Sequence, residues 1–144
     1  MSWFHSSVMA VLPHVPRPIM RRMSARYIAG ETLEEELEKR EEMGRRGFPG
    51  VLDVLGEGVK DEDHARRALQ GYLRAAEALH ARQIDAYVSV KPTHFGLNLS
   101  EGLALELYGT LARRVGELGL FLRVEMEDHP TTDATLRVFE ALRA

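Results

Sequence analysis

The spacing of hydrophobic positions along the chain predicts that strands and helices alternate. Short apolar runs containing β-branched residues predict three strands, and leucine, alanine and tyrosine recur at helical spacing after each of them. The predicted strands are 51–57, 87–91 and 121–126. The predicted helices are 61–82, the segment between Ser100 and Gly119, and 133–143. This order with short connections is typical of a parallel sheet with right-handed crossovers.

The residues before the first strand are predicted to form an N-terminal arm and helices, spanning residues 1–50, ahead of the strand–helix region at 51–144. Three prolines in the first twenty residues discourage a continuous helix there. Thr32 and Glu35 have the spacing of a capping box, which predicts a helix start. Gly47 and Pro49 indicate its end.

Side-chain alternation separates an open sheet from a barrel. An open doubly wound sheet is covered by helices on both faces, so its strands should be apolar on both. Here one face of the strands is apolar, with Val88 and Val90 as examples, and the other is polar. The polar positions are Asp53, Ser89, Lys91, Arg123 and Glu125. This pattern favours a parallel (β/α)8-type barrel with a polar interior, of which the chain carries three strand–helix units.

Lys91 and Glu125 lie at corresponding positions near the carboxyl ends of neighbouring predicted strands. Active sites of parallel barrels lie at that end. Buried charges cost several kcal/mol unless they are paired, and these two can pair with each other. The pair is interpreted as part of a functional site; an architectural ion pair inside the barrel is the alternative.

Composition and charge limit the kinds of partner and site that the chain is expected to have. The net charge of −3 gives no electrostatic reason to expect nucleic acid as a partner, and no cysteine is present. The six histidines show no metal-ligand spacing, so no metal site is predicted. His94 and His129 are interpreted as loop histidines, and Asp53 as a structural residue. Without a long apolar run, a cytoplasmic location is expected, with peripheral attachment at the inner face of the membrane as a variant.

Four segments in order along the chain resemble landmarks of bacterial proline dehydrogenases. They are RYIAGET at 26–32, LDVLGE at 52–57, VSVK at 88–91 and MED at 126–128. The resemblance implies an FAD-dependent barrel that oxidises L-proline, or a close cyclic amino acid, to pyrroline-5-carboxylate. It also implies that the electrons pass to a quinone.

The resemblance also assigns roles to individual residues. Lys91 is expected to bind the substrate carboxylate, Glu125 to be a catalytic residue, and Met126 to contact the flavin. Glu125 stands where the family usually has aspartate, and its side chain reaches about one methylene further. Pro92 and His94 also replace more usual residues of the family. These departures leave the expected fold unchanged. They add an alternative for the substrate, which is a different cyclic or N-alkyl amino acid.

The length of the chain sets a second alternative. A complete barrel of this type needs roughly 200 residues or more, so we expect this chain to be the N-terminal part of one and inactive alone. The alternative is a catalytically inactive half-barrel that acts as an association module. Its expected partner is a second copy of itself or a complementary C-terminal half.

Overall fold

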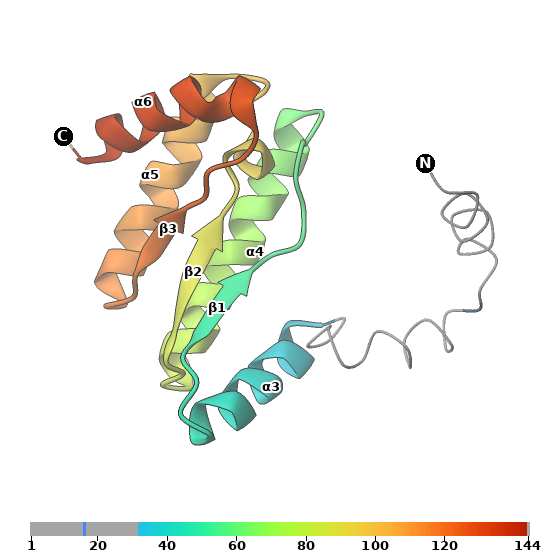
Figure 1. Ribbon diagram of the computed structural model, residues 1–144, viewed down its shortest axis with the longest axis vertical. Coiled ribbons are helices and arrows are strands. Elements are labelled where there is room, and N and C mark those ends of the chain that lie inside the picture. The colour runs from blue at the N-terminus through green and yellow to red at the C-terminus, as the bar shows by residue number, and fades with distance from the viewer. Residues whose placement is uncertain (1–15, 17–31, 144) are drawn as a thin grey trace. The chain divides into compact units, whose positions relative to one another are not determined.

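The computed structural model describes Pro16 and residues 32–143 of the chain. The predicted N-terminal arm and the first segment of the family resemblance lie almost wholly outside these residues. A boundary between two structural units falls between Lys39 and Arg40, inside the first described helix. The described elements in chain order are α3 (Leu33–Arg45), β1 (Gly50–Asp53), α4 (Glu62–Ala81), β2 (Ala86–Val90), η2 (Pro92–Phe95), α5 (Glu101–Glu117), β3 (Leu122–Val124), η3 (His129–Thr131) and α6 (Thr132–Arg143) (Figure 1).

The three strands form one parallel sheet in the order β1-β2-β3. Leu52 pairs with Val88, which pairs in turn with Leu122. One residue further along, Asp53 is level with Ser89 and Arg123. The predicted separation of an apolar and a polar face is therefore confirmed.

The first and third strands are shorter than the pattern predicted. After Asp53 the chain leaves the sheet and forms a loop through Gly58, which adopts a φ of 57°. After Val124 a single further bond, from Glu125 N to the Val90 carbonyl, continues the pairing. Both strands thus give way to loop at the end where the polar side chains gather.

Helices α4 and α5 cover the apolar face of the sheet; in Figure 1 they lie behind the three strands. Their buried residues pack against Leu52, Val88 and Val90, each of which is at most 1% exposed. Tyr108 of α5 reaches the strand directly, because its hydroxyl donates to the Val90 carbonyl over 2.7 Å. Burial of this apolar set, at about 25 cal/mol per Å² of area removed from water, is the main stabilising contribution.

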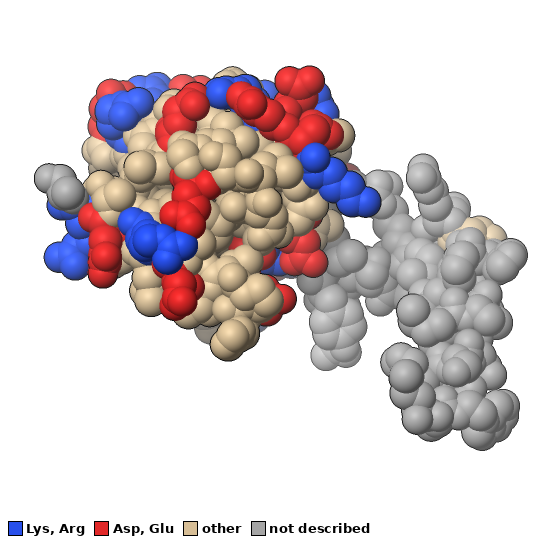
Figure 2. All heavy atoms as spheres, turned by 90° about the horizontal axis from the view of Figure 1, so that it is seen from above, with Lys and Arg blue, Asp and Glu red and all other residues tan. Residues whose placement is uncertain are grey.

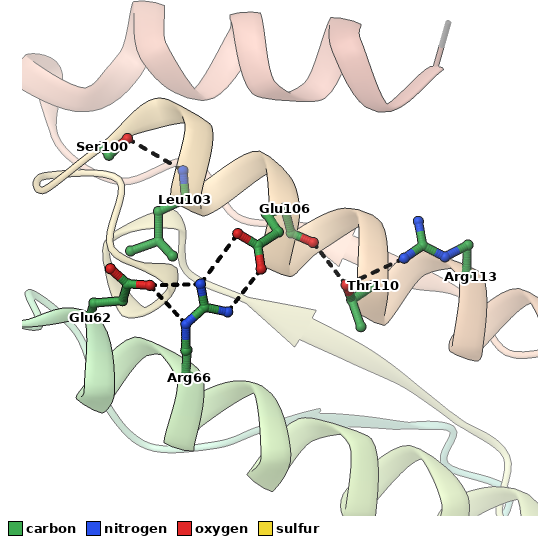
Figure 3. A network of polar contacts seen from close by, with 7 residues as sticks. All are labelled: Glu62, Arg66, Ser100, Leu103, Glu106, Thr110 and Arg113. Carbon is green, nitrogen blue, oxygen red and sulfur yellow. Dashed lines mark hydrogen bonds and ion pairs between the residues drawn. The ribbon is translucent and has the colours of Figure 1, made fainter.

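Local signals determine where the two covering helices begin and how they are joined. Asp61 caps α4 by accepting from His64 N at 2.8 Å, and Ser100 caps α5 by accepting from Leu103 N. Arg66 of α4 then bridges to Glu106 of α5, with Nη1 2.8 Å from Oε1 (Figure 3). These surface contacts align the helices, although exposed ion pairs contribute only about 0–1 kcal/mol each.

The described residues contain no helix that combines the length and the apolar character needed to cross a bilayer.

Candidate active site at the carboxyl ends of the strands

A hollow of about 480 Å³ lies at the carboxyl ends of the strands. The strands point toward the top of Figure 1. Figure 2 looks onto this end and shows acidic and basic side chains interspersed with uncharged surface. The lining comes from the loops after all three strands. It consists of Glu57, Gly58, Lys91, Thr93, Asn98, Glu125, Met126, Glu127 and Asp128. The three residues that the sequence singled out, Lys91, Glu125 and Met126, are therefore brought to one place.

Lys91 directly follows β2 and is bound by a carboxylate, but not by the predicted one. Its ammonium lies 2.9 Å from Oε2 of Glu57, which belongs to the loop after β1. This contact raises the pKa of Lys91 and lowers that of Glu57. The predicted Lys91–Glu125 pair is wrong: Lys91 pairs with Glu57 of the loop after β1, and the Glu125 carboxylate binds Ser89 instead.

Glu125 is bound by a hydroxyl instead. Ser89 of β2 is fully buried, and its Oγ donates to Oε1 of Glu125 over 2.5 Å. The glutamate backbone is level with Lys91 in the sheet, since Ser89 pairs with Arg123 two residues earlier. Its carboxylate therefore points back along the sheet toward Ser89 and not across to Lys91.

Thr93, in η2, joins the three loops to one another. Its Oγ1 accepts from Gly58 N at 2.9 Å and donates to Oε1 of Glu127 at 2.7 Å. Its backbone N–H donates to the other oxygen of the same carboxylate at 2.8 Å. The three strand-end loops are thus fixed to one another by one buried threonine, a residue that the sequence pattern did not mark.

Aromatic packing holds η2 itself in place. Phe95, fully buried, makes edge-to-face contacts with Tyr72 of α4 and Tyr108 of α5 at centroid distances of 5.5 and 4.9 Å. Such contacts contribute about 0.5–1.5 kcal/mol each beyond the buried area. The segment carrying Thr93 is therefore anchored on the helix layer and presents its polar groups to the hollow.

Asp53, at the end of β1, is held by Tyr72, whose hydroxyl donates to Oδ1 over 2.8 Å. This contact agrees with the interpretation of Asp53 as structural. Burial raises the pKa of Asp53, and the Tyr72 bond offsets part of that rise. Glu125 raises it further, whereas Lys91 and His94 lower it. Asp53 thus links the end of β1 to α4.

Exchange of Asp53 for asparagine is expected to remove one pH-dependent contribution to stability. A carboxyl whose folded pKa lies above its unfolded value of 3.8 stabilises the fold most below that value. That contribution disappears as pH rises through the folded pKa. Urea unfolding from pH 3.5 to 7 should show wild type losing stability relative to Asp53→Asn as pH rises. A constant difference between the two would contradict the raised pKa.

His94 is not the loop histidine that the sequence suggested. Its side chain is 8% exposed, and its ring meets Tyr72 edge-on at 5.8 Å. The Nδ1 atom is buried and has no hydrogen-bond partner among the described residues. Burial lowers the pKa of His94, which favours the neutral ring. The ring lies against Gly56 so closely that a Cβ there would be 2.4 Å from Nε2.

Met126 is 53% exposed at the rim of the hollow. A polarizable thioether suits the face or edge of a flat aromatic ring. The donor groups beside it, Lys91 and the side chain of Asn98, can meet the polar atoms of such a ring or of a small anionic ligand. The residues present therefore fit a planar cofactor beside a small charged substrate.

Comparison with known proteins gives the same result for fold and family. The family model described as proline dehydrogenase matches residues 36–144. Proline dehydrogenase from Deinococcus radiodurans is 33% identical over 130 residues, covering 88% of this chain and 42% of the relative. Proline dehydrogenase 1 from Bacillus subtilis subsp. natto is 29% identical over 114 residues, covering 79% of this chain and 38% of the relative. The chain thus spans less than half the length of these curated relatives.

A solved structure resembles the chain in fold. Proline utilization A from Bdellovibrio bacteriovorus, inactivated by N-propargylglycine, superposes with a TM-score of 0.73 and 23% identity. The superposition covers 83% of this chain and 15% of that one. The fold prediction, an incomplete parallel α/β barrel, is confirmed. On the family model and the identity to its relatives, the chain belongs to the proline dehydrogenase family.

Proposed function

We propose that the chain supplies the first three strand–helix units of a flavin-dependent enzyme that oxidises L-proline, or a close cyclic amino acid, to pyrroline-5-carboxylate. The observation that supports this most directly is the position of Lys91. Its ammonium lies at the carboxyl end of β2, beside the hollow, and its carboxylate partner comes from an exposed loop. Family membership supplies the reaction, and this arrangement supplies a place for the substrate.

Lys91 is proposed to bind the carboxylate of the substrate. Its present partner, Glu57, has a side chain that is 70% exposed. Exposed ion pairs contribute about 0–1 kcal/mol, so an incoming carboxylate displaces Glu57 at small cost. Glu125, on the neighbouring strand, is proposed to balance the positive charge on the substrate nitrogen. A zwitterionic amino acid then finds a cation and an anion on adjacent strands.

FAD is the proposed cofactor, with Met126 against its ring. When bound, FAD accepts the two electrons and two protons that leave the substrate nitrogen and the adjacent carbon, and passes the electrons to a quinone. The described residues contribute positioning: Lys91 and Glu125 orient the substrate, and Thr93 keeps the three loops that carry them together. Displacement of water by the bound ligands strengthens these charge interactions.

The proposal includes a partner for the open sheet face. Phe121, next to β3, is 65% exposed and meets Tyr87 edge-on at 5.7 Å. In a complete barrel this face would be lined by the remaining strands. The same exposed aromatic surface would support the alternative function, a half-barrel that associates with another chain without catalysis. Activity after completion of the barrel separates the two.

The test is a chimaera in which this chain is joined to the part of the Deinococcus radiodurans relative that follows the aligned region. The purified chimaera is expected to show flavin absorbance and to reduce an artificial electron acceptor when L-proline is added. Pipecolate and N-methylproline serve as alternative substrates. A chimaera that folds and binds FAD but oxidises none of them would overturn the enzymatic proposal and favour the association module.

A further inference from the structure

Three glutamates line the hollow together with Lys91, and each has a different partner. Glu57 pairs with Lys91 itself, Glu127 is held by Thr93, and Glu125 is held by Ser89. Neutral hydroxyl donors therefore hold two of these three glutamates. Only the exposed loop carboxylate, among those of the described lining, is in contact with the lysine.

From charge alone, Glu125 would be expected to pair with Lys91, but the structure shows a different partner. Its backbone is level with Lys91 on the same face of adjacent strands, which lie about 4.8 Å apart. Ser89 lies two residues earlier, about 6–7 Å along the strand. The carboxylate nevertheless bonds to Ser89 at 2.5 Å. Glutamate has one methylene more than aspartate, and this additional length allows the Glu125 carboxylate to reach back to Ser89.

The two possible partners for Lys91 differ in how easily a ligand can displace them. Glu57 stands on a loop and is largely exposed, so its pairing is weak and reversible. Glu125 is less exposed, and a pair between partly buried groups costs more to break, since it leaves a desolvated charge unpaired. A Lys91–Glu125 pair would therefore compete with an anionic ligand more strongly than the Lys91–Glu57 pair does.

We propose that Ser89 is a positioning residue, whose buried hydroxyl holds the Glu125 carboxylate away from Lys91 and so keeps the lysine accessible to an anionic ligand. The inference rests on the proposed function for the identity of that ligand. The positioning itself is a property of the described side chains and can be measured without substrate, flavin or turnover.

The experiment follows the titration of Lys91 by NMR in chain labelled with ¹³C at the lysine ε-carbons. The chain has three lysines, so Lys91 is assigned by one Lys91→Arg spectrum, and Lys39 and Lys60 provide internal references. The charged groups that act on Lys91 are Glu57, Asp53 and Glu125. Five proteins are compared: wild type, Ser89→Ala, Ser89→Thr, Glu125→Gln and the double variant Ser89→Ala/Glu125→Gln.

Loss of the hydroxyl is expected to raise the Lys91 titration midpoint, because the released Glu125 carboxylate then approaches the ammonium. Ser89→Thr, which retains the hydroxyl, should titrate like wild type. The double variant should show no rise relative to Glu125→Gln alone. An unchanged midpoint in Ser89→Ala, or an equal rise in the Glu125→Gln background, would show that Ser89 does not act through Glu125 and would overturn the proposal.

A second variant keeps the test open if Ser89→Ala does not fold. Glu57→Gln changes an exposed side chain and removes the partner that Lys91 has in the structure. With Ser89 intact, Glu125 stays where it is, so the Lys91 midpoint is expected to fall. A midpoint that remains at the wild-type value would mean that Glu125 has replaced Glu57, and the proposal would be wrong.

Discussion

Exchange of Lys91 for methionine in the chimaera is expected to lower kcat/KM for L-proline by about 10- to 100-fold, mainly by raising KM. A hydrogen bond to a charged group contributes about 1.5–3 kcal/mol, and each 1.4 kcal/mol corresponds to a factor of ten. The carboxylate is present in both the substrate and the transition state, so its loss of binding affects KM more than kcat. Steady-state rates with an artificial acceptor measure both constants.

The matched control is Lys60→Met, which removes the same charge from an exposed loop residue outside the hollow. It should leave both constants within about twofold of wild type, since isolated surface substitutions have small effects. The Lys91 variant must also retain its flavin absorbance and its unfolding midpoint. A Lys91→Met enzyme with unchanged KM would mean that another group binds the carboxylate.

The face on which Lys91 lies was predictable, because strand geometry leaves few choices. Successive side chains point to opposite faces, so Val88 and Val90 on the helix side require Ser89 and Lys91 on the other. The register then follows from pairing the apolar positions of each strand. Capping was equally local: Ser100, at the start of the predicted helical segment, accepts from Leu103 N. These features depend on a few neighbouring residues and on one rule of geometry.

The partners within the site were not predictable in the same way. The choice of Glu57 over Glu125 as the partner of Lys91 depends on how the loop after β1 folds, and hydrophobic periodicity says nothing of a loop. The role of Thr93 depends on groups 34 and 35 residues away in sequence. Threonine at the end of a strand carries no distinctive pattern, so only the assembled loops reveal it.

His94 is a third case, because its close contact with Gly56 joins two residues that lie far apart in the sequence. Gly56 is not one of the described glycines that adopt a positive φ. Conformational freedom therefore does not explain why this position is a glycine. The explanation is the His94 imidazole, which occupies the space that a Cβ at Gly56 would need. A glycine required by close packing cannot be distinguished in sequence from one required by a turn. The partner that occupies the space must be known first.

Exchange of Gly56 for alanine is accordingly expected to destabilise the fold by about 1–3 kcal/mol, the usual cost of forcing an additional methyl group into a packed region. The new Cβ would lie 2.4 Å from Nε2 and 2.5 Å from Cε1 of His94, so the ring or the loop must move. The loop carries Glu57, so the Lys91–Glu57 contact should be disturbed as well. Urea unfolding at pH 7 measures the loss.

Gly116 supplies the control for that substitution, because a Cβ at this helical position in α5 would meet no atom within 4 Å. Gly116→Ala is expected to stabilise the chain by about 0.5–1 kcal/mol, since alanine favours the helix more than glycine does. The same chemical change should thus act with opposite sign at the two sites.

A double-mutant cycle with His94→Ala then identifies the cause of the Gly56 effect. If the imidazole is what a Cβ meets, Gly56→Ala should cost much less in the His94→Ala background, with a coupling energy in the range of about 0.5–3 kcal/mol that contacting residues show. An equal loss in both backgrounds would place the strain in the backbone of the loop. His94 would then have no part in holding the loop whose Glu57 pairs with Lys91.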